Sequence, residues 1–186
     1  MNQLIKLLKL ASTYVLAILN KIYLKIVYGN KIELNGLQHI RRGAKIVIQN
    51  GKIHLNRGFI MQKGAYLSAV GGGRISIGEG VFINRNTTVV CRERISIGEN
   101  TLLGPNCLIY DHDHKFTAKG IVPGEYKTGA VEIGNNCWIG AGVIILRNTK
   151  IGDNCVIGAG CVVKGNVPDK SLVTSPREMI INPIHE

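Results

Sequence analysis

The sequence predicts an all-β protein of stacked coils, preceded by one amphipathic helix. Three observations predict this fold class: aliphatic residues recur every six positions, glycine and asparagine lie between them, and a basic apolar segment opens the chain. A period of six matches neither the α-helical turn, at about 3.6 residues, nor the two-residue alternation of a strand. It fits short strands joined by tight turns, with one apolar residue per block pointing inward.

Residues 1–30 are predicted to form an amphipathic helical segment. Apolar residues fall at helical spacing from Leu4 to Ile22, and four lysines are interspersed: Lys6, Lys9, Lys21 and Lys25. The longest stretch without a charge, residues 10–20, is too short to span a bilayer, and no cleavage site follows it. The helix is therefore expected to pack on its own domain or a sister subunit, or else to lie on an acidic membrane surface.

The coils are predicted over residues 31–175, followed by a C-terminal tail at 176–186. From Ile133 the inward positions keep the period of six, and the fifth position of each block is small or β-branched. An earlier segment, from Ile77 to Ile109, repeats the pattern with one slip of two residues after Val89. Coils of this kind satisfy one another's backbone hydrogen bonds in stacked strands.

The five cysteines are predicted to be packing residues rather than redox groups. Four of them occupy the small fifth position of a block: Cys107, Cys137, Cys155 and Cys161. The odd number, the lack of a CxxC pair and the lack of a signal peptide favour a reducing compartment. We therefore expect a cytoplasmic protein, which would lie on the inner face of the membrane if its first helix binds lipid.

The spacing between Ile109 and Ile133 predicts an extruded loop. Twenty-four residues separate the two, which leaves room for one more coil. That coil would bury Lys115 and Lys127, and a buried lysine without a partner is strongly destabilising. The segment KGIVPGEYKTG is also rich in glycine, proline and charge. We therefore expect a loop over about residues 111–130.

Two histidines, His112 and His114, lie at the root of this loop, flanked by Asp111 and Asp113. Long loops that leave a rigid repeat often carry function, and histidine, with an unperturbed pKa of about 6.5, suits proton transfer near neutral pH. In an acyl transfer a base removes the acceptor's proton while a donor holds the carbonyl oxygen. The aspartates would then orient an imidazole; the alternative is a set of solvated loop side chains.

The formal charge of +11 favours anionic partners such as phosphates, nucleic acid or an acidic membrane. Aromatic residues make up only 5% of the chain, and no basic run alternates with them as a base-stacking surface requires. We therefore expect no nucleic-acid partner.

The consecutive blocks IGNNCW, IGAGVI, ILRNTK, IGDNCV and IGAGCV resemble the hexapeptide-repeat acyltransferases, over roughly residues 40–175. The resemblance implies a left-handed parallel β-helix with three six-residue faces, an exception to the usual right-handed crossover. It also implies an enzyme that uses coenzyme A and assembles as a homotrimer, with adjacent subunits building each site. The same fold carries carbonic anhydrases and structural subunits, so a metal hydrase and a non-catalytic β-helix scaffold are alternatives.

The segment GPNCLIYDHDH resembles the maltose/galactoside acetyltransferases and the polysaccharide O-acetyltransferases. An ungapped match of their PN…H run at Asn106 implies that the catalytic histidine is His114, with His112 as a second member of the site. The resemblance also places Asn84 near the acceptor, although Asn84 fits a turn between coils equally well. Trp138 would wall the acceptor pocket or pack at the subunit seam.

The same resemblance implies acetyl-CoA as the donor substrate. Its pantetheine arm would lie along the backbone at Ala141 and Ala159, in the two IGAG turns, and Lys164 and Arg177 would meet its phosphates. No metal is expected, because a zinc hydrase needs three converging imidazoles and the histidines outside the loop lie well away from the in-phase blocks.

These expectations combine into an acetyl-CoA-dependent O-acetyltransferase that acts on a sugar hydroxyl in surface polysaccharide biosynthesis. The maltose/galactoside group carries an acidic pair where this chain has Cys91 and Arg92, and it has a different amino-terminal helical segment. Small free sugars are therefore less suitable acceptors than a lipid-linked or polymeric glycan or its nucleotide-sugar precursor. An N-acetyltransferase that acts on an amino sugar nucleotide is the alternative within the same chemistry.

Overall fold

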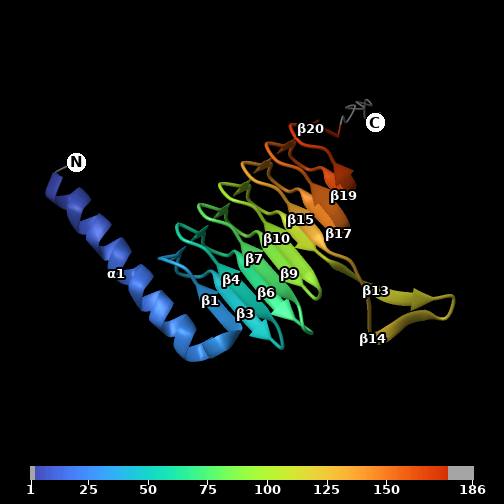
Figure 1. The fold of residues 1–186 in the computed structure, drawn as a ribbon, viewed down its shortest axis with the longest axis horizontal. Coiled ribbons are helices and arrows are strands. Elements are labelled where there is room, and N and C mark those ends of the chain that lie inside the picture. The colour runs from blue at the N-terminus through green and yellow to red at the C-terminus, as the bar shows by residue number, and fades with distance from the viewer. Residues whose placement is uncertain (1–2, 176–186) are drawn as a thin grey trace, which may run out of the picture.

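The computed structural model describes residues 3–175 and shows one α-helix leading into a β-solenoid (Figure 1). Helix α1 (Gln3–Tyr28) continues into a short 3₁₀ turn, η1 (Gly29–Lys31), and the chain then winds into coils of parallel strands. The expected all-β fold class, with an amino-terminal helix and an extruded loop, is confirmed. The predicted tail at 176–186 lies outside the described residues.

The coils build three faces. The first face holds β1 (Ile32–Leu34), β4 (Lys52–Leu55), β7 (Arg74–Ile77), β10 (Arg94–Ile97) and β15 (Val131–Ile133). The second holds β2 (His39–Ile40), β5 (Ile60–Met61), β8 (Phe82–Ile83), β11 (Leu102–Leu103), β16 (Trp138–Ile139), β18 (Val156–Ile157) and β20 (Leu172–Val173). The third holds β3 (Lys45–Gln49), β6 (Tyr66–Val70), β9 (Thr88–Cys91) and β12 (Leu108–Tyr110). Two longer strands, β17 (Ile144–Ile151) and β19 (Val162–Val167), run along the third face and continue onto the first.

The inward positions of the six-residue blocks form a continuous hydrophobic column. On the first face Ile77, Ile97 and Ile133 stack through β7, β10 and β15, and all three are buried. The turns use residues that tolerate a positive φ, such as Asn136 at 53° and Asn154 at 57°. All five cysteines are buried and free, so they pack in the column.

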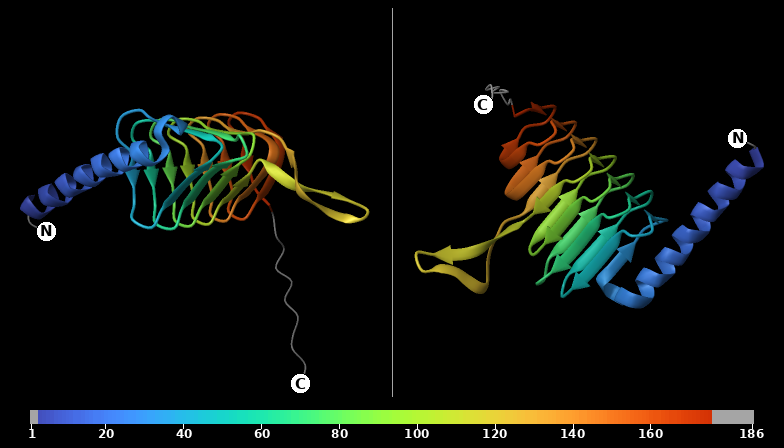
Figure 2. Two further views of the ribbon diagram at one scale, coloured as in Figure 1. Left: turned by 90° about the horizontal axis from the view of Figure 1, so that it is seen from below. Right: turned by 180° about the vertical axis from the view of Figure 1, so that it is seen from behind.

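The loop expected at about residues 111–130 is a two-stranded antiparallel hairpin, β13 (His112–Thr117) and β14 (Gly120–Thr128). Ile95 pairs with Val131, 36 residues later, whereas Val131 pairs with Thr149, only 18 residues later. The hairpin therefore takes the residues of one coil out of the solenoid without changing its phase. It projects from one side of the solenoid while α1 extends from the other, as Figure 2 shows.

Helix α1 is attached to the first coil through polar groups of its C-terminal half. Asn20 Nδ2 donates to the carbonyl of Ile40 at 2.9 Å, and Tyr28 Oη donates to that of Ile46 at 2.6 Å. This part of the helix packs on its own domain, which is one of the two arrangements expected from the sequence.

The prediction that this segment is too short to span a bilayer is wrong by length and composition. It rested on the charge-free stretch alone. The helical segment from Ile5 to Lys31 is long and apolar enough to cross a membrane, and only 12% of the apolar 18-residue window within it is buried.

The hydrophobic column predicts a steep cost for truncating an inward residue. Ile77→Ala is expected to lower the free energy of unfolding by about 2–5 kcal/mol, because Ile77 is fully buried and its loss leaves a cavity. The neighbouring Ser76 points outward on the same strand, so Ser76→Ala should change stability by less than about 0.5 kcal/mol. Urea denaturation of both variants measures the difference, and equal effects would contradict the assigned register.

Candidate active site

Asp111 is a fully buried carboxylate at the corner where the chain leaves the solenoid. It accepts hydrogen bonds from the backbone N–H groups of Arg92, Glu93 and Arg94, at 2.8, 2.7 and 2.9 Å. The thiol of Cys91 donates to it at 3.2 Å. Three amides and a thiol thus enclose one carboxylate and satisfy a charge whose burial would otherwise be costly.

The turn that encloses Asp111 is the place where the six-residue period slips. Val89 and Ile97 are eight residues apart rather than six, so the turn between β9 and β10 is two residues wider. Strand β12 lies beside β9, with Tyr110 opposite Val90, so Asp111 comes next to Cys91 and the widened turn. Consecutive backbone amides that converge in this way form an anion-binding nest.

His112 is held by Asp111. Its Nδ1 lies 3.0 Å from Asp111 Oδ1, and its side chain is only 12% exposed. Tyr110 and Tyr126 meet the imidazole edge-on, with ring centres 5.9 and 5.6 Å away. Because an ionised carboxylate only accepts hydrogen bonds, Nδ1 carries the proton, and Nε2 is the basic nitrogen of the neutral ring.

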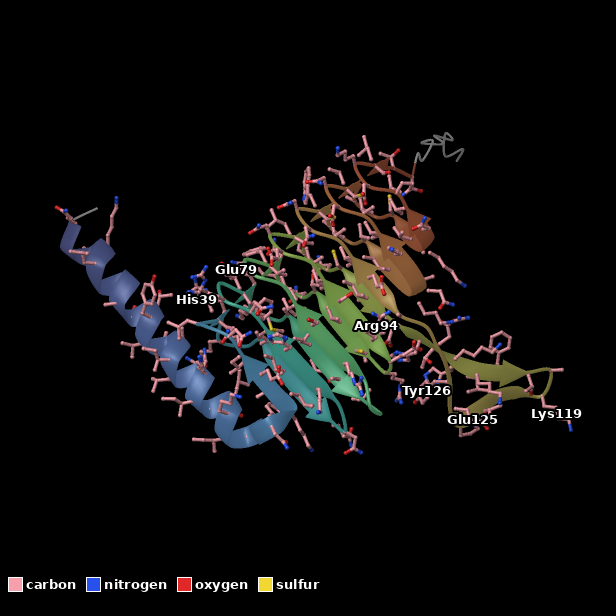
Figure 3. All side chains as sticks on the ribbon, viewed as in Figure 1. His39, Glu79, Arg94, Lys119, Glu125 and Tyr126 are labelled. Carbon is pink, nitrogen blue, oxygen red and sulfur yellow. The ribbon has the colours of Figure 1, made fainter. Side chains whose placement is uncertain are left out.

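His114 follows two residues later on β13 and is exposed. Its ring lies against Tyr126 of β14, with centres 4.9 Å apart and planes tilted by 41°. The guanidinium of Arg92 stacks on the same tyrosine, 3.4 Å from the ring centre. Tyr126 thus contacts both imidazoles and the turn that binds Asp111. Figure 3 shows it at the base of the hairpin, with Lys119 at the tip.

Asp113 makes a second attachment between hairpin and solenoid. Its Oδ2 accepts a hydrogen bond from Nε of Arg147 on β17 at 2.5 Å. The two aspartates therefore have different contacts: Asp111 orients His112, and Asp113 pairs with an arginine. Across residues 3–175 no group of three or more His, Cys, Asp or Glu side chains could hold a metal ion.

The pKa values of the buried groups agree with a charged Asp111. Burial by itself raises the pKa of this carboxyl, but hydrogen bonds from His112, from the Glu93 and Arg92 amides and from Cys91 outweigh it, so the pKa is lower than usual. Burial, reinforced by the charge of Asp111, raises the pKa of the Cys91 thiol far above its ordinary range. The thiol therefore stays protonated and donates to the carboxylate.

Three of the other predicted site residues share one corner of the solenoid, between the second and third faces. Asn84 follows β8, Ala141 follows β16 and Ala159 follows β18, and backbone hydrogen bonds stack the turns on one another. The Asn84 side chain accepts from the Arg85 amide at 2.8 Å, so Asn84 does cap a turn between coils. Both alanines are exposed, as contact with a ligand along this corner requires.

The remaining predicted residues lie elsewhere. Trp138 is 59% exposed on β16 of the second face, in register with Leu102 and Val156. Lys164 is exposed on β19. Arg177 lies outside the described residues. The predicted site residues thus form two groups, one at the hairpin root and one at the corner of stacked turns. Strand β17 begins just after the corner turn at Ala141 and contacts the hairpin root through Arg147.

Tyr126 and Arg147 are site residues that could not be predicted from the sequence. Neither carries a local signal, because Tyr126 is defined by the strand register of the hairpin and Arg147 by its distance from Asp113 in space. Cys91 and Arg92 did stand out, as a departure from the family pattern at the slip in the period. The slip is the sequence signal from which a role for this turn could have been predicted.

The lowered pKa of Asp111 predicts a pH-dependent contribution to stability. Because the pKa is lower in the folded chain, ionised Asp111 stabilises the fold above the unfolded value of about 3.9, and this is lost as pH falls through the folded value. Asp111→Asn should therefore lower the free energy of unfolding by roughly 1–3 kcal/mol at neutral pH, with the difference from wild type shrinking in acid. Urea titrations of both proteins from neutral to acidic pH test this, and a constant difference would contradict it.

Comparison with known proteins agrees with the fold. Residues 130–165 match the family model described as bacterial transferase hexapeptide (six repeats), and residues 94–109 match the hexapeptide repeat of succinyl-transferase. A putative lipopolysaccharide biosynthesis O-acetyl transferase of Escherichia coli K12 is 28% identical, over 74% of this chain and 75% of its own length. The matched region spans only 36–41% of the length of several other curated relatives.

Two solved structures extend the match. A maltose O-acetyltransferase from Clostridium difficile is 32% identical with a TM-score of 0.50, and the alignment covers 76% of this chain and 68% of that one. A hexapeptide-repeat acetyltransferase from Vibrio cholerae, complexed with acetyl coenzyme A, is also 32% identical with a TM-score of 0.50, over 53% and 54% of the two chains. The chain belongs to the hexapeptide-repeat acyltransferases.

Proposed function

We propose that the protein transfers an acetyl group from acetyl-CoA to a sugar hydroxyl in surface polysaccharide biosynthesis. The observation that carries the proposal is the hairpin root, where the solenoid presents two imidazoles, one of which is bonded to a buried carboxylate that accepts hydrogen bonds from three backbone amides. The relative from Escherichia coli, named for lipopolysaccharide biosynthesis, supports the acceptor class.

The donor is proposed to lie along the corner of stacked turns. A Cβ added at Gly104 would come 2.7 Å from the Ala141 amide, and one added at Gly140 would come 2.6 Å from the Ala159 amide, so these turns stack with almost no space between them. In the two IGAG turns the exposed side chains are the methyl groups of Ala141 and Ala159, which leaves the backbone there accessible to a thin pantetheine arm. The exposed ammonium of Lys164 would bind the nucleotide phosphates. The solved acetyl coenzyme A complex of a relative supports this choice of donor.

His114 is proposed as the general base, as the family alignment implies. Its exposed ring is able to reach an acceptor, whereas His112 is enclosed by Asp111 and two tyrosines. The base takes the proton of the sugar hydroxyl as its oxygen attacks the thioester carbonyl. Collapse of the tetrahedral intermediate breaks the carbon–sulfur bond, and the protonated imidazole returns the proton to the leaving thiolate. Asp111 and His112 act as positioning residues for this step.

We also propose that the protein is a homotrimer whose subunits meet along the second face. A row of apolar side chains stands in register along the outside of the second face: Phe82, Leu102, Trp138, Val156 and Leu172. Leu102, Trp138 and Leu172 are 47%, 59% and 70% exposed. A continuous apolar row of this kind suits a subunit contact, which would make Trp138 a seam residue.

Single substitutions distinguish the roles of the two histidines. His114→Ala should lower kcat for acetyl transfer by about 10²–10⁴-fold, because the acceptor's proton loses its base. His112→Ala should cause a smaller loss together with lower stability, since it leaves a buried carboxylate short of one donor. His54, which bonds to Asn35 at 2.9 Å outside both groups, provides the control in His54→Ala. A large loss in His112→Ala with full activity in His114→Ala would move the base to His112.

The product identifies the reaction. Incubation of the protein with acetyl-CoA and a panel of lipid-linked, polymeric and nucleotide-linked sugars should give an acetylated glycan and free thiol. The added acetyl group should be removed by mild alkali, because an ester hydrolyses there and an amide does not. An alkali-stable product on an amino sugar would contradict O-acetylation and establish the N-acetyltransferase alternative.

A further inference from the structure

Helix α1 turns its apolar side to solvent. Ala17 and Leu24 pack on the first coil, at 2% and 5% exposure. A row of large apolar side chains at helical spacing is 47–78% exposed: Val15, Ile18, Leu19, Ile22 and Ile26. Water-soluble surfaces rarely carry a continuous apolar row of this size, so the row marks an interaction surface.

The polar side of the helix is already occupied by the solenoid. Lys21 Nζ donates to the carbonyl of Gly36 at 2.7 Å, and Lys25 Nζ donates to that of Ile32 at 2.8 Å. These carbonyls belong to the first coil, which has no preceding coil to pair with, so the lysines cap the open end of the solenoid. Rotation of α1 to bury its apolar row would break these bonds, and the chain therefore holds the row outward.

A basic rim borders the apolar row. Arg41, Arg42 and Lys45 are exposed on the first coil and line a cavity of about 560 Å³. Leu16 and Tyr23 of α1, 58% and 61% exposed, line the same cavity. Residues 1–32 include no aspartate or glutamate, so no acidic group of the helix offsets this charge.

We propose that this end of the molecule, α1 with its basic rim, docks on the surface of a bilayer that contains anionic lipid. The apolar row would enter the boundary between headgroups and acyl chains, and the three basic side chains would meet lipid phosphates. A second copy is a poor occupant, because pairing two such ends would bring the rims of like charge together. The inference rests on α1 and the first coil, and it is independent of the proposed reaction.

Vesicle co-sedimentation with the full chain tests the proposal. The protein should pellet with vesicles of phosphatidylcholine and phosphatidylglycerol, and much less with phosphatidylcholine alone or at high salt. Leu19→Ser/Ile22→Ser/Ile26→Ser should weaken binding by about 10²-fold or more, because the substitutions remove the inserting side chains. These residues are exposed, so circular dichroism and thermal unfolding of the variant should match wild type.

Charge-reversal variants distinguish attraction of the basic rim to anionic lipid from an effect of the protein's net charge. Arg41→Glu/Arg42→Glu/Lys45→Glu should also weaken binding by about 10²-fold. Lys119→Glu/Lys127→Glu/Lys150→Glu changes the net charge equally but lies on the hairpin and β17, and it should keep most of the binding. Ile121→Ser/Val162→Ser, at 69% and 62% exposure, is the apolar control and should bind as wild type.

Three results would overturn the proposal. The first is a wild-type protein that does not pellet with the mixed vesicles. The second is equal loss of binding in the rim variant and its matched charge control. The third is a helix variant that keeps vesicle binding but changes the oligomer mass in light scattering, which would make the apolar row a contact between subunits.

Discussion

In-register pairing between coils is the constraint on which this molecule depends. Each strand exchanges backbone hydrogen bonds with the equivalent strands of its neighbouring coils, so the chain must keep its phase. An insertion is tolerated only if the chain leaves and re-enters at the same place. The hairpin meets this condition, because the amide of Gly129 donates to the carbonyl of Asp111 at 2.9 Å and closes its base.

The Asp111 carboxylate makes this exit point rigid. It is bound by the widened turn at residues 92–94, and through His112 and Tyr126 it connects that turn to both strands of the hairpin. The Asp113–Arg147 pair adds a second attachment. The imidazoles are therefore supported by the solenoid itself, and such preorganisation is what proton transfer during acyl transfer requires.

The sequence was most informative where periodicity governs structure. The six-residue period predicts the inward positions from Ile133 onward and the burial of the cysteines. It also predicts that Lys115 and Lys127 lie on a segment outside the solenoid. The contacts of the site do not, because they join residues whose separation in the chain carries no signal. Asp111 was treated as a possible loop carboxylate, yet it is buried by amides from an adjacent coil, and only a slip in the period marked that coil. For α1, helical spacing was sufficient to predict the element, but the orientation was set by open carbonyls of the first coil that pattern alone does not show.

The central claim is that the hairpin root forms the acyl-transfer centre. The most direct test is a crystal structure of the assembled protein with acetyl-CoA bound. The account predicts the thioester carbon close to His114, in a groove between neighbouring chains, with the pantetheine arm along the turns at Ala141 and Ala159. A donor bound far from both His112 and His114, with those rings facing bulk solvent, would contradict it.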